Sequence, residues 1–206
     1  MEMNQFLEAV SSAAPVPGGG GVCAYAAALG MSLGSMVANL TTGKKKYTEY
    51  EEEIQEILKK AANVAAGLAA GVEKDAKAFE PLSKAYGLPK STEEELAYRT
   101  EVMEKALAEA AAAPLSLMEE IMEALTILDR LSVIGSRLAI SDVGVGVQLC
   151  RAALNGGALN VYINTKLMKN RELAEEMNQR VRKLSEEGNR LADKIFAEVE
   201  ESICRF

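Results

Sequence analysis

The sequence predicts an all-α protein, a single-domain bundle of several helices around a central buried helix rich in glycine and alanine. Apolar residues recur at steps of three and four along most of the 206 residues, and no stretch alternates apolar and polar residues as a strand would. This length suits one domain, spanning residues 1–206, better than two. Segment 22–40 is almost entirely apolar, which is typical of a helix buried on all sides.

Two prolines and four glycines separate the first two expected helices. A short first helix carries Phe6, Leu7 and Val10 on one face. It ends before segment 15–21, because prolines lack an N–H and glycines lower helix stability. The apolar helix over 22–40 then follows.

Capping signals and prolines define the middle of the chain. Thr48 to Glu51 has the form of a capping box and predicts the start of a long helix. Pro81 and then Gly87-Leu88-Pro89 are expected to end it. A second capping box, Thr92 to Glu95, predicts the start of the next helix. Pro114 is expected to kink or split that helix.

The last third of the chain predicts two more helical regions. Residues 133–168 are mostly apolar, and we expect a break at Asn155 to Gly157 because two glycines follow the asparagine. From Asn170 to the end, apolar residues at helical spacing predict one long amphipathic helix. With the earlier segments this gives six or more helices.

Composition excludes several classes of function. The net charge of −7 argues against a nucleic-acid partner, because neutralising phosphates requires a basic surface. Three widely spaced cysteines without a C-x-x-C motif indicate reduced thiols in a cytoplasmic protein. The chain has no histidine, which excludes every imidazole base and the common zinc motifs. We therefore expect no metal and no prosthetic group, and any proton transfer must use other side chains or water.

The charge-free run 9–43 raises the alternative of a membrane span. Lys44 to Lys46 follow it, as the positive-inside rule requires. The prolines and glycines cut the run to about the minimum of ~20 residues for a span, and several polar residues dilute it. Glu2 and Glu8 also stand where a signal peptide is basic. We therefore expect a core helix and no membrane partner.

Four features are candidates for a site. Segment 15–21 precedes a helix, so its backbone N–H groups suit anions or polar ligand atoms, although it fits neither the Walker A nor the dinucleotide motif. The alternative is a flexible turn. Lys44 to Lys46 with Tyr47 suit a carboxylate ligand, or simply a helix C-terminus. Asn160 and Asn164 lie one turn apart and either face one cavity or serve as structural hydrogen bonders.

Two aspartates lie in apolar surroundings. Asp75 lies on or beside the apolar stripe of its helix, three residues after Val72 and four before Phe79, where an unpartnered carboxylate is costly. The alternative is that Asp75 lies at the edge of this stripe, where its carboxylate is in contact with solvent. Asp142 is almost alone in an apolar run, and its alternative role is a helix cap.

These residues resemble the cyclodeaminase/cyclohydrolase family, which includes the C-terminal domain of formiminotransferase-cyclodeaminase. The matching motifs occur in the family's order and span nearly the whole chain. They are Pro15-x-Pro-Gly-Gly-Gly, Ser35 to Tyr47, Asp75-Ala76-x-Ala78-Phe79, Ala113-Pro114-Leu115, Ser141 to Val145 and Asn160 to Asn164. Two positions depart from the family pattern: Gly21 stands where a serine is expected, and Val16 where threonine is common.

The resemblance implies an all-helical, dimeric enzyme that acts on one-carbon derivatives of tetrahydrofolate. The main reading is a cyclodeaminase (ammonia-lyase) that converts 5-formiminotetrahydrofolate to 5,10-methenyltetrahydrofolate and ammonia. The alternative within the family is a cyclohydrolase that interconverts the methenyl and 10-formyl forms with water. An alternative of another class is a non-catalytic helical scaffold. Since the chain carries no formiminotransferase portion, we expect a free-standing member.

The resemblance and the residue chemistry together give a hypothesis for the site. Asp75 and Asp142 flank the reacting carbon. Lys44 to Lys46 either hold the anionic tail of one or several glutamates or supply the acid, and Lys44 is the catalytic candidate among them. The positions expected to bind substrate are Pro17, Gly18, Gly19, Gly20, Asn39, Lys45, Lys46, Tyr47, Ser141, Asn160 and Asn164.

Overall fold

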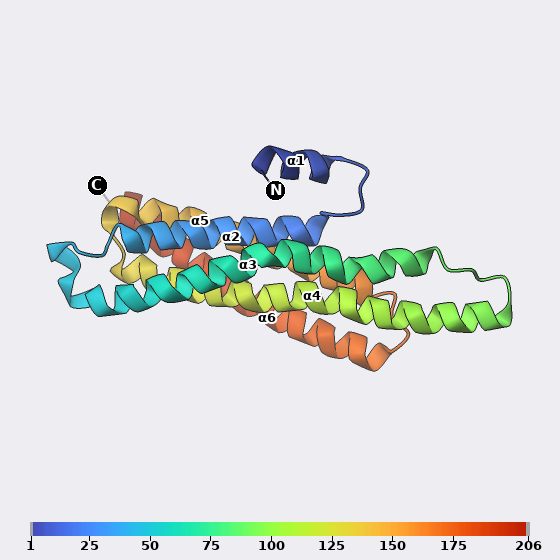
Figure 1. The fold of residues 1–206 in the computed structure, drawn as a ribbon. Coiled ribbons are helices and arrows are strands. Elements are labelled where there is room, and N and C mark those ends of the chain that lie inside the picture. Colours follow the sequence, from blue (N-terminus) through green and yellow to red (C-terminus); the bar gives the residue numbers. More distant parts are fainter. Residues whose placement is uncertain (1, 205–206) are drawn as a thin grey trace.

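The computed structural model describes residues 2–204, and within that range it contains helices and connecting segments but no strand (Figure 1). The prediction of an all-α bundle is confirmed. The α-helices are α1 (Met3–Ser11), α2 (Gly19–Asn39), α3 (Glu51–Tyr86), α4 (Glu93–Ile134), α5 (Ile140–Thr165) and α6 (Arg171–Cys204), and two 3-10 helices, η1 (Lys45–Tyr50) and η2 (Arg137–Ala139), connect them.

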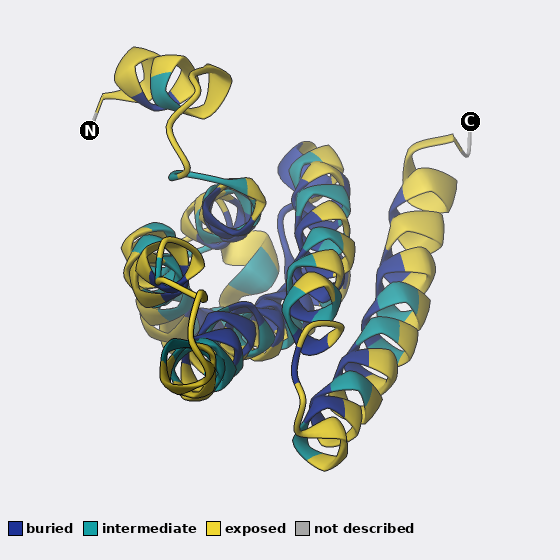
Figure 2. Cartoon of the chain, turned by 90° about the vertical axis from the view of Figure 1, so that its right-hand side faces the viewer, coloured by how far each residue is buried: buried dark blue, intermediate teal, exposed yellow. Residues whose placement is uncertain are grey.

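The five long helices lie roughly side by side, and α1 lies outside their bundle (Figures 1 and 2). Helix α2 packs against α3 and α5, while α4 packs against α3 and α5 and α6 covers α5 and α4. The core includes the stripe of α4 predicted by its spacing, from Met118 through Ile121 to Leu131, which is fully buried. Helical periodicity therefore predicts correctly which face of α4 is buried.

Helix α2 is not buried on all sides, contrary to the expectation. Its alanines and glycines face α3 and α5, but Val22, Leu29 and Met36 are 38%, 45% and 39% exposed. The reason is that, among the helices of residues 2–204, only the short α1 lies over the outer side of α2 (Figures 1 and 2). By length and composition α2 is long and apolar enough to cross a membrane, and half of its most apolar window is buried inside the bundle.

Glycines placed at close helix contacts explain two wrong boundaries. Helix α2 begins at Gly19 rather than residue 22, so Gly20 and Gly21 are helical. Helix α5 runs without a break through Gly156 and Gly157. A Cβ at Gly156 would overlap Cys23 Sγ of α2, and one at Gly157 would lie 2.9 Å from Met118 Cγ of α4. These glycines allow neighbouring helices to approach closely and do not end the helix.

Both internal prolines also lie inside continuous helices. Helix α3 continues through Pro81 to Tyr86, so Pro81 does not end it, whereas the predicted stop at Gly87 is confirmed. Helix α4 runs through Pro114 and is not split. The packing of both helices along their length outweighs the local cost of one missing N–H in each.

The two predicted capping boxes have different outcomes. Thr92 caps α4: its hydroxyl accepts a hydrogen bond from Glu95 N at 3.2 Å, and Glu95 accepts one from Thr92 N. Thr48 does not cap α3, because its hydroxyl donates to the carbonyl of Lys45 within η1. Glu51 instead accepts hydrogen bonds from the preceding turn.

The first helix is attached at a single point. Phe6 is buried and its ring centroid lies 5.0 Å from that of Tyr25 on α2. Leu7 and Val10, predicted on the same face as Phe6, are 58% and 38% exposed, so only Phe6 of the three is buried. A helix of nine residues covers too little of α2 to bury its own apolar side.

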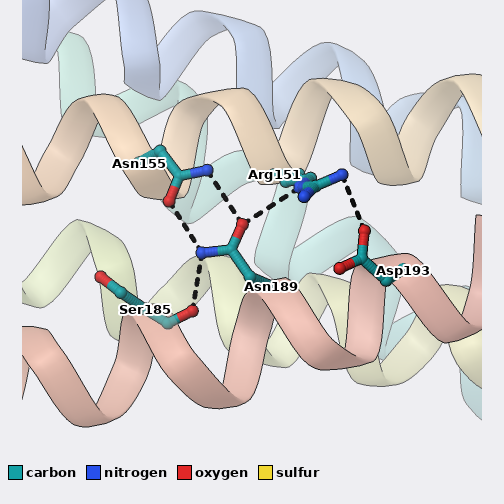
Figure 3. Close-up of polar contacts among 5 residues, drawn as sticks. All are labelled: Arg151, Asn155, Ser185, Asn189 and Asp193. Atoms are coloured by element: carbon teal, nitrogen blue, oxygen red, sulfur yellow. Dashed lines mark hydrogen bonds and ion pairs between the residues drawn. The ribbon is translucent and has the colours of Figure 1, made fainter.

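A polar seam joins α5 to α6 (Figure 3). Asn189 of α6 exchanges hydrogen bonds with Asn155 of α5 at 2.9 and 3.0 Å, and Arg151 Nε donates to the same Asn189 oxygen at 3.0 Å. Arg151 also pairs with Asp193 at 2.8 Å. Arg151 is the one charged residue between 143 and 165, and it is paired with α6.

Candidate functional site

A cavity of about 240 Å³ lies at the N-terminal end of α2. Four elements meet there: the segment before α2 with the first turn of that helix, the C-terminal half of α3, the end of α5 and one residue of α4. The lining residues are Pro15, Val16, Gly18, Gly19, Gly20, Asp75, Phe79, Leu82, Tyr86, Ala110, Asn160, Ile163, Asn164 and Leu167.

Asp75 provides the acidic group of this cavity. Its carboxylate faces the first turn of α2 so closely that a Cβ at Gly20 would overlap it. Burial raises the pKa of Asp75, and a hydrogen bond from the backbone N–H of Gly21 opposes that rise. The result is a half-buried carboxyl group that is a stronger base than an ordinary aspartate. The prediction that Asp75 lies beside an apolar stripe is confirmed in geometry.

The glycine segment forms one wall of the cavity and begins α2. The N-cap residue of α2, Gly18, provides no side-chain cap, and Asp75 accepts a hydrogen bond from the N–H of Gly21. The other first-turn N–H groups and the positive end of the helix dipole therefore suit a polar or anionic ligand group. Gly18, Gly19 and Gly20 line the cavity, whereas Pro17, which follows a cis peptide bond, packs against Gly21. A Cβ at Gly21 would lie 3.3 Å from Pro17 Cβ, so the departure from serine relieves a tight contact.

Asn160 and Asn164 both line the cavity, and both also make structural hydrogen bonds. Asn160 Nδ2 donates to the carbonyl of Gly156, and Asn164 Nδ2 donates to that of Asn160 at 2.8 Å. Asn164 Nδ2 also reaches the carbonyl of Ala110 at 3.2 Å. That carbonyl has no helical partner because Pro114, four residues later, has no N–H. Pro114 thus frees an acceptor that fixes Asn164 at the cavity.

The apolar wall of the cavity is the part that sequence reasoning missed. Along one face of α3, the wall continues from Asp75 through Phe79, Leu82 and Tyr86. On the other side it consists of Ile163 of α5 and Leu167, just after the end of that helix. A signal was present, since residues 75, 79, 82 and 86 are spaced by four, three and four and so lie on one helix face. Only the position of the neighbouring helices shows that this face lines a cavity.

The lysine corner, defined as Lys44, Lys45, Lys46 and Tyr47, lies after the C-terminal end of α2. Gly43 makes the turn into it with a φ of +72°, a conformation that favours glycine. Tyr47 Oη accepts a hydrogen bond from Arg137 N at 3.1 Å, which lowers the pKa of Tyr47, and the charges of Lys46 and Lys44 lower it further.

Hydrogen bonds of Ser136, Thr41 and Glu51 fix the lysine corner against the bundle. Lys44 Nζ lies 3.3 Å from Ser136 Oγ. The buried hydroxyl of Thr41 accepts from Ser136 N at 2.8 Å and donates to the carbonyl of Val37. Glu51 accepts from Thr42 and from Gly43 N. The corner is therefore held by buried polar contacts, while its three lysine side chains are exposed.

A single chain does not bring Asp75 together with Asp142 or with the lysine corner. Helix α5 runs antiparallel to α2, since Asn160 lies against Gly19 and Gly146 lies against Gly30. Asp142, at the start of α5, is thus 18 residues from Asn160, about 27 Å along the helix. The arrangement in which both aspartates of one chain flank a single carbon is not formed within that chain.

Three other predicted residues share the end of the bundle that holds Asp142. Asn39 is exposed at the end of α2 and donates to the carbonyl of Ser35 at 2.9 Å. Ser141 is exposed and borders an apolar groove between α5 and the end of α6. Asp142 is partly buried in the first turn of α5. Pro17, Gly18, Gly19, Gly20, Asn160 and Asn164 lie at the Asp75 end.

Among residues 2–204, no group of three Cys, Asp or Glu side chains is placed to hold a metal ion. Cys23 lies near Asp75, and burial together with the charge of Asp75 raises the pKa of its thiol. Burial raises the pKa of Cys150 to about 12. Neither thiol is therefore activated as a nucleophile.

Comparisons with known proteins place this geometry in a family. A family model described as Formiminotransferase-cyclodeaminase matches residues 2–183. A methenyltetrahydrofolate cyclohydrolase of Methylorubrum extorquens is 38% identical over 198 residues, which cover 96% of this chain and 95% of that protein. The formimidoyltransferase-cyclodeaminase of Rattus norvegicus is 30% identical over 198 residues, but these cover only 37% of that protein.

A solved structure agrees with the sequence comparisons. The formiminotetrahydrofolate cyclodeaminase of Thermotoga maritima superimposes with a TM-score of 0.82 at 29% identity, covering 98% of this chain and 95% of that one. The fold and the matched length agree. The chain belongs to the formiminotransferase-cyclodeaminase family.

Proposed function

We propose that this protein is a tetrahydrofolate one-carbon enzyme, a formiminotetrahydrofolate cyclodeaminase that forms 5,10-methenyltetrahydrofolate and releases ammonia. Family membership and the Thermotoga maritima structure support the reaction class. The observation that carries the proposal is the half-buried Asp75 carboxyl group, which faces a cavity with one apolar wall and one wall of backbone N–H groups. An apolar wall suits the folate ring system, and the N–H groups and amides suit its polar edge.

Asp75 accounts for the proton transfers of this reaction. The N10 atom of the folate attacks the carbon of the formimino group, which is protonated on its terminal nitrogen, and Asp75 accepts the N10 proton. The bond from that carbon to the terminal nitrogen then breaks, and the nitrogen takes the proton and leaves as neutral ammonia. The methenyl product carries a delocalised positive charge, which the nearby carboxylate stabilises. No imidazole is needed.

The alternative is a methenyltetrahydrofolate cyclohydrolase, and the 38% identical relative supports it. The same carboxyl group would remove a proton from the water that attacks the methenyl carbon. An absorbance assay for the methenyl form separates the two, run in parallel with 5-formiminotetrahydrofolate and with 5,10-methenyltetrahydrofolate. Methenyl formation from the first substrate supports the cyclodeaminase, and loss of methenyl in the second assay supports the cyclohydrolase. Absence of both activities, and of reduced-folate binding by calorimetry, would favour a scaffold.

We further propose that the active form is a homodimer, associated through α2 and α5. Between residues 19 and 39 α2 carries no charge, and the exposed Val22, Leu29 and Met36 are spaced by seven residues about its midpoint. On α5, Leu159 and Ile163 are 69% and 60% exposed. Uncharged outer faces with large exposed apolar side chains are typical of subunit interfaces. A two-fold axis near Leu29 would pair Val22 of each copy with the partner subunit's Met36.

This dimer would complete the site. Such an axis sets the N-terminal end of α2 beside the C-terminal end of the partner's α2, so the partner subunit's lysine corner would lie near the Asp75 cavity. There Lys44, Lys45 and Lys46 would bind the glutamate tail or tails, with Asn39, Ser141 and Asp142 beside them. We also propose a cytoplasmic location and one domain over residues 1–206, as expected from the cysteines and the length.

A further inference from the structure

Asp75 borders a second, smaller hollow on the other side of α3. This crevice lies between α3 and α4 and has a volume of about 90 Å³. Asp75 is the one residue that lines both spaces. The other lining residues of the crevice are Gly71, Lys74, Ala113, Pro114, Ser116, Leu117 and Glu120. One carboxyl-bearing residue therefore separates two openings of very different size.

The size of the crevice restricts what it can hold. A volume of about 90 Å³ accommodates a few water-sized molecules but not a folate ring system. The occupant is therefore a molecule with one or a few heavy atoms.

The mouth of the crevice is polar and open. Ser116 and Lys74 are exposed, and Lys74 Nζ pairs with Glu120 Oε1 at 3.1 Å across the gap between α3 and α4. Both side chains of this pair are partly in solvent, so the pair opens and closes at little cost in free energy. A small molecule that hydrogen-bonds can pass such a mouth.

We infer that the α3–α4 crevice is the passage for the small co-reactant, ammonia leaving or water entering, while the folate fills the larger cavity. The inference rests on the proposed function. A folate seated in the larger cavity blocks the way from Asp75 through that side, because the ligand occupies it. Ammonia released at the reacting carbon then leaves past Asp75 into the crevice as the neutral molecule, so no net proton accompanies it. For the hydrolase reaction, water moves the opposite way.

A bulky side chain at the mouth tests the passage kinetically. Ser116→Phe is expected to lower kcat about tenfold while KM for the folate substrate stays unchanged, because transfer of the small molecule becomes limiting. Thr126→Phe, on an exposed site of the same helix away from the crevice, is the matched control and is expected to leave kcat unchanged. Running both folate substrates shows whether ammonia or water is the molecule affected. A Ser116→Phe enzyme with the kcat of the wild type overturns the inference.

Chemical labelling tests the passage without catalysis. In a Cys23→Ser, Cys204→Ser background, Asp75→Cys is treated with methyl methanethiosulfonate, with and without saturating 5-formyltetrahydrofolate. With the folate analogue bound, we expect the rate of labelling to stay within about threefold of the rate without it, because the crevice is still open. When Ser116→Phe is added and the analogue is bound, we expect the rate to fall about tenfold, because the ligand then blocks the larger cavity and the new side chain blocks the crevice. Complete protection by the folate analogue alone overturns the inference. Failure of wild-type protein to bind any folate instead contradicts the proposed function.

Discussion

The two ends of the bundle divide the chemistry of this protein between them. At the start of α2, a carboxyl group, backbone N–H groups and amides surround a cavity, and no lysine or arginine of the described chain lines it. Beyond the end of α2, three exposed lysines and a tyrosine gather around Ser136 and Arg137. About 30 Å of helix separates these groups, since α2 spans 20 steps from Gly19 to Asn39. If these groups serve one reaction, as proposed, a second chain must bring them together.

The largest expected effect is at the acidic end. Asp75→Asn keeps the shape of the side chain but removes the base, so turnover is expected to fall on the order of 10²–10⁴ with helix content unchanged. The measurement is methenyl absorbance with either folate substrate, and circular dichroism controls for folding. Near-normal turnover would remove Asp75 from the reaction.

The pH dependence should show the same carboxyl group. Because burial raises the pKa of Asp75, kcat/KM is expected to fall tenfold per unit as the pH drops below a value higher than the ~4 of an ordinary aspartate. The base acts only when ionised, so the loss occurs on the acid side. A pH–rate profile checks this, and the limb should vanish from the residual activity of Asp75→Asn. An acid limb at or below pH 4 would contradict the assignment.

A smaller effect is expected at the lysine corner. Replacing Lys44, Lys45 and Lys46 together by alanine removes the cations for the glutamate tail, and KM is expected to rise about tenfold or more. The ratio of the variant's KM to that of the wild type should shrink at high salt, because screening weakens the same interaction in the wild type. Lys59→Ala with Lys60→Ala, on the exposed face of α3, is a control for total charge. Equal effects of the two sets would mean that the corner has no specific role.

The smallest effect concerns the support of that corner. Thr41→Val leaves the buried N–H of Ser136 without an acceptor, which is expected to cost about 1–3 kcal/mol of unfolding free energy. Urea denaturation measures this, and Thr126→Val, at an exposed site, is the control. A stable Thr41→Val protein would show that another group satisfies Ser136.

Sequence periodicity predicts the helices well because it reports a local property, the side of each helix that is buried. It places Asp75 beside the apolar stripe of α3 and places Asn160 and Asn164 on one face, and both predictions hold in the structure. It misplaces the start of α2, and it predicts a stop at Pro81, a kink or split at Pro114 and a break at Asn155 to Gly157, although the helices continue through all three places. The packing of neighbouring helices decides whether a helix continues.

The division of the site could not be predicted in the same way. Asp75 and Asp142 both lie in apolar runs, and nothing local distinguishes a pair that meets from a pair at opposite ends. Their separation follows from the antiparallel contact of α2 with α5, where Gly30 and Gly146 approach so closely that a Cβ at either would lie 2.7 Å from the other's carbonyl oxygen. Such contacts depend on tertiary structure and leave no periodic signal.

Mixing two impaired variants tests most directly whether two copies build one site. Asp75→Asn protein is mixed with the lysine-corner triple variant under conditions that exchange subunits, and turnover is measured at a subsaturating folate concentration. If the partner supplies the corner, half of the dimers become mixed and each holds one intact site, so about a quarter of wild-type turnover returns. If both groups serve the same site within one chain, no intact site forms and turnover stays at the mean of the two variants.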